Sequence, residues 1–246
     1  MVIKLNFLTS FIITILSGMS TLIGCLILLN KSINYKKVLS NSLLFSSGVM
    51  LFISVFDLIP SSFLYINKIY DFIPSMAIIG VYVLFGGILV YTLDSKYKNN
   101  NKIYKIGIIS MLTLIIHNIP EGIITFVSSS KDLSVGIPIA FSIALHNIPE
   151  GIAISVPLYY GDKNIKKAFL YTLCSALSEP FGAIIGYLFF YKIDYYFFGV
   201  ILSFTSGIMI YLSIFELFIE GIKYKEKNFF YFLLGMIIIL LSILLI

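Results

Sequence analysis

The hexapeptide His-Asn-Ile-Pro-Glu-Gly occurs twice in this sequence, from His117 to Gly122 and from His146 to Gly151, and it holds the chain's only two histidines. In each copy the histidine and the glutamate are four residues apart, so on a helix they share one face, with the asparagine on an adjoining stripe. An imidazole nitrogen, an amide oxygen and a carboxylate presented together are ligands for a metal ion. The two copies therefore predict a metal site between facing helices.

A third acidic residue belongs to the same prediction, because the stretch Ser-Ala-Leu-Ser-Glu-Pro-Phe-Gly again sets a glutamate beside a proline. A set of imidazole, amide and carboxylate without thiolate favours borderline divalent ions such as zinc or ferrous iron. Two carboxylates shared between the faces can hold two adjacent ions. The candidate metal ligands are His117, Asn118, Glu121, His146, Asn147, Glu150 and Glu179.

The composition predicts that these residues lie within a membrane. Hydrophobic residues make up 59% of the chain, charged residues 12%, and the mean hydropathy is +1.00, whereas a soluble domain has about 45–50% apolar and about 25% charged residues. The apolar runs are long and continuous, as in helices that cross a bilayer, and do not alternate like barrel strands. We expect an all-α, polytopic membrane protein, one transmembrane domain over 1–246, with eight spans at about 7–29, 40–65, 76–93, 106–128, 135–158, 168–190, 196–219 and 229–246.

These spans place the candidate ligands at mid-depth, since His117, His146 and Glu179 fall near the middle of the fourth, fifth and sixth spans. A charged side chain there costs about 2.5–3.5 kcal/mol, so three carboxylates need a compensating cation or proton. Pro120 and Pro149 each deprive a carbonyl of its helical partner. Such carbonyls are tolerated in a membrane where protein buries them or a wet cavity lies beside them.

The distribution of lysine predicts the orientation. All seventeen basic residues are lysines, and thirteen of them follow the first, third, fifth or seventh span. Because lysine-rich loops stay in the cytoplasm, we expect a multi-pass protein of the cell membrane with both termini outside. The first span is too long for a signal peptide and is interpreted as a retained helix. No basic face suited to nucleic acid is present. The thirteen are Lys31, Lys36, Lys37, Lys96, Lys98, Lys102, Lys105, Lys163, Lys166, Lys167, Lys223, Lys225 and Lys227; the others are Lys4, Lys68, Lys131 and Lys192.

An internal repeat links the two halves of the chain. The stretch SGVMLFISVFDL (47–58) agrees with SGIMIYLSIFEL (206–217) at six of twelve positions. The second span runs outward and the seventh inward, so the repeat is inverted. We expect helices 1–3 to pair with helices 6–8 around helices 4 and 5, an arrangement common in secondary transporters.

The acidic residues of the repeat leave two interpretations open. Asp57 and Glu216 can line the two ends of a path through the protein or can reach water at the interfaces. Met50 and Met209 lie deeper on the same spans, where a thioether can bind a soft ion or pack in the core.

The paired hexapeptides, together with SEPFGA in the sixth span and SGIMIYLSIFEL in the seventh, resemble the signature of the ZIP family of divalent metal ion transporters, and in particular its ZupT-like bacterial branch. The resemblance covers essentially the whole chain. It implies uptake of zinc and other divalent ions toward the cytoplasm by an elevator-like carrier, often a homodimer. One departure is the loop from Asp94 to Lys105, which lacks the histidines that many members carry there.

The resemblance also implies a two-metal centre between helices 4, 5 and 6. Its two positions share the hexapeptide glutamates as bridges. The first position would use His117, Glu121, His146 and Glu150, and the second Asn118, Asn147 and Glu179.

We therefore expect a divalent metal transporter rather than an enzyme, with no cofactor and with Zn²⁺ or another divalent metal as bound substrate. The alternative is a membrane-embedded metal-dependent hydrolase, whose metal would activate water; no His-Glu-x-x-His motif supports it. A carrier of an organic solute that uses the acids for protons is a further alternative. The sequence does not rank zinc, iron, manganese, cobalt, nickel and cadmium.

Overall fold

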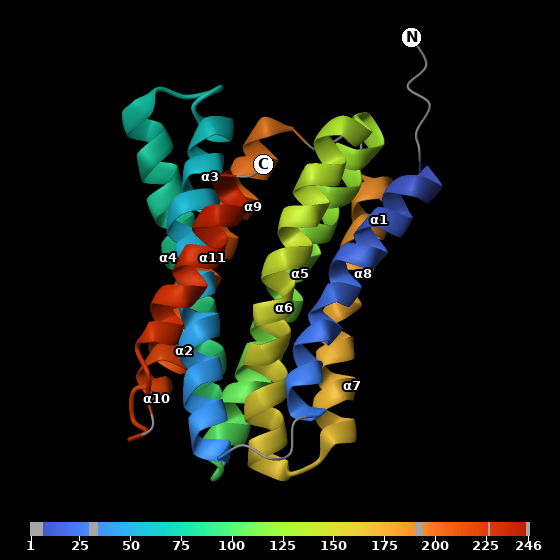
Figure 1. Ribbon diagram of the computed structural model, residues 1–246. Helices are drawn as coiled ribbons and strands as arrows, with labels where there is room; N and C mark the ends of the chain where they lie inside the picture. The colour runs from blue at the N-terminus through green and yellow to red at the C-terminus, as the bar shows by residue number, and fades with distance from the viewer. Residues whose placement is uncertain (1–6, 30–33, 190–193, 226, 245–246) are drawn as a thin grey trace.

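The structure is a computed structural model and describes residues 7–29, 34–189, 194–225 and 227–244. All regular secondary structure within these ranges is helical, and the helices form one elongated bundle (Figure 1). The elements in chain order are α1 (Phe7–Met19), η1 (Ser20–Leu29), α2 (Tyr35–Ile53), η2 (Ser54–Leu58), α3 (Ile59–Ile66), α4 (Phe72–Lys96), α5 (Lys102–Lys131), α6 (Leu133–Asp162), α7 (Ile165–Ala176), α8 (Ser178–Leu188), α9 (Tyr195–Tyr211), η4 (Leu212–Phe218), α10 (Ile219–Gly221) and α11 (Phe230–Leu244).

Seven helical stretches in this part of the chain are long and apolar enough to cross a membrane. They coincide with the first seven expected spans, which confirms a multi-pass helical membrane protein. The helices extend beyond the expected limits, as Lys102–Lys131 does, because their ends carry lysines and polar residues that hydropathy excludes. The eighth expected span is represented by α11, an apolar helix that is shorter than each of these seven stretches. The count of eight spans therefore stays a prediction.

Asparagine and aspartate side chains fix where five of the helices begin. Each accepts a hydrogen bond from a backbone N–H of the first turn, which would otherwise lack a partner. The cap between α5 and α6 is the single residue Asp132, so the chain reverses there and the two hexapeptide helices run antiparallel. The caps are Asn34, Asn101, Asp132, Asn164 and Asp194.

The helices sort into two groups (Figure 1). In the first, which we call the motif group, α5 packs against α6 and α8, and α6 packs against η1; α1 and α7 complete it. In the second, the flanking group, α4 packs against α9 and α2 against α11, with α3 against α9. The principal contact between the groups is that of α2 with α6. Both hexapeptides therefore lie within the motif group. The helix of the flanking group that packs against α6, and so against the second hexapeptide helix, is α2.

Glycines allow the closest helix contacts in the motif group. A Cβ atom on Gly182 of α8 would collide with the carbonyl oxygen of Ile119 on α5, and one on Gly24 of η1 would come 2.6 Å from the backbone nitrogen of Ile152 on α6. Both contacts fall beside a hexapeptide. The backbone of a neighbouring helix thus approaches each hexapeptide within van der Waals distance.

Several helices of the bundle are irregular. The first span tightens from α-helix into the 3₁₀ segment η1, and both η2 and η4 are π-helical. The sixth span, expected to be one helix, is interrupted at Leu177 between α7 and α8. Pro180 explains the interruption, since its ring clashes with the carbonyl four residues earlier. Glu179 therefore stands in the first turn of α8 and not in the middle of a continuous helix.

The described helix ends that flank the loops expected to be lysine-rich share one end of the bundle (Figure 1). There Lys105 Nζ lies 2.6 Å from Asp94 Oδ1, and Lys102 Nζ lies 3.1 Å from Glu220 Oε2. The opposite end holds the start of α1 and is the end toward which α11 runs. Lys4, Lys31 and Lys192 lie outside the described residues. Which end faces the cytoplasm stays a prediction.

Candidate metal centre

The hexapeptides occupy the middle of the two longest helices. His117 stands halfway along α5 and His146 near the middle of α6. Their side chains and those of the matching glutamates are all buried, with Glu121 4% exposed and Glu150 fully enclosed. This position halfway along each helix agrees with the mid-depth expected for the candidate ligands.

Four of the predicted ligands converge on one point. Glu121 Oε1 lies 3.1 Å from His117 Nε2 and 2.9 Å from His146 Nε2, so this oxygen joins the two hexapeptides. Glu150 Oε1 lies 3.2 Å from the same nitrogen of His117. Ligand atoms of His117, Glu121 and His146 all fall within 4.8 Å of one another, as a shared metal ion requires.

The distances suit metal ligands as well as hydrogen bonds, and the shortest of them, from His146 Nε2 to Glu121 Oε1 at 2.9 Å, is a hydrogen bond. Neighbouring ligands of a tetrahedral zinc ion with bonds near 2.0–2.1 Å are about 3.3 Å apart. His117 Nε2 makes no hydrogen bond of acceptable geometry to either glutamate within the described residues, despite the short distances. Buried polar atoms without partners call for an ion or water. Further such atoms here are Glu121 Oε2, Asn147 Oδ1, Glu150 Oε1 and Glu179 Oε2.

The remaining predicted ligands are attached to this set through amide groups. Asn147 Nδ2 donates to the Ser17 carbonyl at 3.0 Å and also to Glu179 Oε1. The side-chain amide of Asn118 is oriented so that its nitrogen donates to Glu150 Oε2 at 3.2 Å and to the Leu114 carbonyl at 2.9 Å, because both of these atoms are acceptors. The backbone of Glu179 packs on Gly122, directly after Glu121. The structure thus brings the seven predicted residues into one buried cluster from α5, α6 and α8.

Charge in this cluster favours a cation. Glu121, Glu150 and Glu179 are all buried, and the two imidazoles, even if both were protonated, would offset only two of three negative charges. An ionised group inside a membrane protein usually pairs with an opposite charge or lines an ion path. Divalent cations are suited to this set because each carries the charge of two protons and accepts oxygen and nitrogen ligands.

Serines on the first two spans hydrogen-bond to α6 beside the cluster, and sequence reasoning missed them. Ser46 Oγ donates at 2.7 Å to the carbonyl of Pro149, and Ser20 Oγ donates at 2.8 Å to that of Ala144. Ser17 contributes the carbonyl that Asn147 contacts. The only signal in the sequence was the serine content of two otherwise apolar spans, which does not specify a partner.

The two methionines of the repeat belong to the packing of the bundle. Met50 and Met209 are fully buried among apolar residues of the main core. The acidic residues of the repeat lie on the π segments. Asp57 of η2 accepts a hydrogen bond from Ser61 Oγ at 3.2 Å. Glu216 of η4 is buried, with 8% of its surface exposed.

Fold and site together define a class: a multi-pass helical membrane protein with an anionic, imidazole-containing cluster at mid-depth. Comparison with known proteins names the family. The family model described as "ZIP Zinc transporter" matches residues 95–245. The chain is 37% identical to the zinc transporter ZupT of Streptococcus mutans, with 96% of this chain and 97% of that protein covered. It is 36% identical to the zinc transporter ZupT of Clostridium perfringens, with 98% and 96% covered. This chain belongs to the ZIP zinc transporter family.

Proposed function

We propose that this protein carries divalent metal ions across the membrane, with the buried cluster as their binding site. The observation that carries the proposal is the convergence of both hexapeptides on Glu121 Oε1, 2.9 Å and 3.1 Å from the two histidines at mid-depth. The relatives are named as transporters, so neither an enzyme nor the hydrolase alternative is favoured. No cofactor is part of the proposal, because the metal is the substrate.

The ligand assignment is part of the proposal. One metal position would be formed by the two histidines with Glu121 and Glu150, whose atoms lie within 3.2 Å of His117 or His146. The second position would be formed by the amide oxygens and Glu179. Asn147 supports it, because its amide nitrogen donates to Glu179 while its Oδ1 is buried without a hydrogen-bond partner among the described residues. The amide nitrogen of Asn118 donates in the same way to Glu150. Glu121 and Glu150 would bridge the two ions.

Zinc is the first substrate to test. Imidazole with carboxylate and no thiolate suits zinc and ferrous iron, and the same set accepts manganese, cobalt, nickel and cadmium. The relatives' printed name, zinc transporter, supports this order. A ligand set of mixed type also suits release, which a transporter needs.

The inverted repeat is supported by matching features in its two halves. The π segments η2 and η4 coincide in the repeat and carry Asp57 and Glu216 at the same position. Gly182 of the sixth span packs on α5 as Gly24 of the first packs on α6. Both correspondences are what an inverted repeat would produce, with helices 1–3 matching helices 6–8 and helix 4 matching helix 5, in a protein of eight crossing helices.

Orientation and direction follow from the lysines. The end of the bundle that holds the loops after the first, third, fifth and seventh spans would face the cytoplasm, both termini would lie outside, and metal would move inward. π segments concentrate at functional sites, which supports Asp57 at the outer end and Glu216 at the inner end of the path. The homodimer that the family resemblance implies stays a prediction.

Transport of labelled zinc into liposomes that contain the purified protein tests the proposal. The double substitution Glu121→Gln and Glu150→Gln should abolish flux, because it removes both bridging carboxylates. Asp162→Asn is the matched control, since Asp162 is an exposed acid paired with Lys167 at 2.8 Å, away from the cluster. Undiminished zinc flux in the double variant would exclude the proposal. Unlabelled divalent ions should compete, whereas organic solutes should not.

A further inference from the structure

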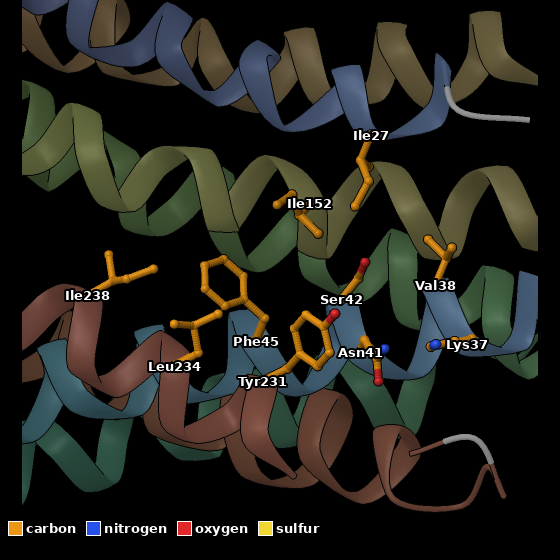
Figure 2. A pocket seen from close by; sticks show the side chains of 10 residues that line it. All are labelled: Ile27, Lys37, Val38, Asn41, Ser42, Phe45, Ile152, Tyr231, Leu234 and Ile238. Atoms are coloured by element: carbon orange, nitrogen blue, oxygen red, sulfur yellow. The ribbon is translucent and has the colours of Figure 1, made fainter. Parts of the chain in front are cut away.

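A groove separate from the hexapeptides lies between the two helix groups (Figure 2). Its volume is about 650 Å³, within the range of about 300–1,000 Å³ typical of ligand sites. The flanking group supplies one wall from α2 and α11. The motif group supplies the other through Ile27 of η1 and Ile152 of α6.

The lining changes character along the groove. At one end Lys37, Asn41 and Ser42 of α2 lie near the hydroxyl of Tyr231 (Figure 2). At the other end the lining is apolar, with Phe45, Leu234 and Ile238. Ile27 and Ile238 are 36% and 39% exposed, so the groove opens to the side of the bundle, where lipid tails lie. This polarity fits an amphiphile with its head at Lys37.

A buried amide at the polar end has an unused acceptor. Asn41 is 7% exposed, and its Oδ1 has no hydrogen-bond partner among the described residues. Buried polar atoms without a partner are rare in native proteins and point to a ligand or water. A lipid headgroup or glycerol hydroxyl placed at this end would supply the missing donor.

The charge of the groove selects an anionic head. Lys37 is exposed at its mouth, and none of the ten described residues that line the groove is acidic. Lysines beside the membrane surface attract anionic lipids, and basic pockets between transmembrane helices bind their headgroups. A soluble peptide would have to enter a site that opens to hydrocarbon along most of its length.

We propose that this groove binds an anionic phospholipid, with the phosphate at Lys37 and one acyl chain along Phe45, Leu234 and Ile238. The acyl chain would touch both helix groups at once, because Ile27 and Ile152 of the motif group line the same groove. Its binding would therefore depend on the spacing between the groups and would stabilise the arrangement seen in this structure. The inference is independent of which metal the protein carries.

Retention of lipid by the purified, full-length protein tests this proposal. The protein is exchanged into detergent with equal amounts of phosphatidylglycerol and phosphatidylcholine, and the bound lipid is counted by native mass spectrometry. Phosphatidylglycerol should be retained preferentially. Lys37→Gln should lower that retention about fivefold, the effect of one lysine near an anionic lipid. Lys98→Gln, an exposed lysine at the same end of the bundle, should leave it unchanged.

A second pair of variants tests the acyl-chain end without changing charge. Ile238→Trp fills the apolar end and should displace the lipid, whereas Ile237→Trp, exposed on another side of the same helix, should not. Equal retention of both lipids, or equal effects within either pair of variants, would overturn the proposal. Because lipid is counted without metal, this result is separate from that of the zinc flux experiment.

Discussion

At the scale of single residues, Glu121 stands out in the cluster because one of its oxygens meets a histidine from each hexapeptide. A single hexapeptide would provide a kink and two or three polar atoms on one helix. The second copy, on an antiparallel helix, provides opposing ligands at the same depth. Glu179 differs from both, since it stands at the start of α8 and reaches the cluster through Asn147.

This difference predicts distinct effects for the two glutamates. Glu179→Gln should remove the second metal position and leave the histidine position, so zinc bound per chain should fall from about two to about one. Glu121→Gln removes a ligand of both positions and should weaken binding at least tenfold, because even groups that only support a ligand affect metal affinity by about 10–100-fold. Equilibrium dialysis with metal analysis measures both. Unchanged stoichiometry in Glu179→Gln would refute the two-position assignment.

At the scale of elements, the glycine contacts set the distance between α5 and α8. A Cβ atom on Gly182 would collide with the backbone of α5 at Ile119 and approach Gly122. Gly182→Ala should therefore lower the free energy of unfolding by about 1–3 kcal/mol, the usual cost of overpacking, and weaken zinc binding by displacing Glu179. Gly80→Ala is the control: Gly80 lies on α4 with open space around it, and alanine should be neutral or stabilising by up to about 1 kcal/mol. Unfolding in mixed detergent compares them; equal stabilities would contradict the packing argument.

A hydrogen bond between the two groups gives a second prediction at this scale. Ser46 Oγ of α2 donates to the Pro149 carbonyl of α6 at 2.7 Å and so joins the two groups. Ser46→Ala should cost about 0.6 kcal/mol, the average for such bonds in membranes. Ser95→Ala, at an exposed hydroxyl that bonds within its own helix, should cost less. The same unfolding assay measures both variants. If both substitutions lowered the free energy of unfolding equally, the Ser46 hydrogen bond between the groups would contribute no stability of its own.

Some elements were predictable from local chemistry and others were not. The spans follow from apolar runs, and the depth of His117 follows from counting residues along its span. The interruption at Leu177 and the π-helical turns around Asp57 were not predicted, because they depend on packing against neighbouring helices. The types of the candidate ligands could be read directly from the sequence. Their shared helical faces were predictable from the spacing of three and four residues. The contact of Asn147 with Ser17 was not, since it joins helices 130 residues apart in the chain.

At the scale of the whole molecule, the two helix groups differ in what they hold. The motif group contains every predicted ligand, and the flanking group contributes Ser46 and one wall of the groove between the groups. A carrier exposes its binding site to each side of the membrane in turn, and repeats of opposite orientation provide two related arrangements. Ion pairs such as Lys105 with Asp94 lie between the groups at the lysine-rich end, where changes of spacing would break or form them.

Direction of transport depends on which end faces the cytoplasm, and this can be tested by labelling. Replacing Cys25 and Cys174 by serine removes both native thiols, and one new cysteine is then placed at Asn67, between α3 and α4, or at Lys98, between α4 and α5. These loops lie at opposite ends of the bundle (Figure 1). A membrane-impermeant maleimide should label Asn67→Cys in intact cells and Lys98→Cys only after the membrane is opened, because the lysine-rich end should be retained inside. The parent without cysteines controls for background, and zinc flux verifies that each variant is folded. Labelling of Lys98→Cys in intact cells, without that of Asn67→Cys, would reverse the orientation and place Asp57 rather than Glu216 at the cytoplasmic end of the path.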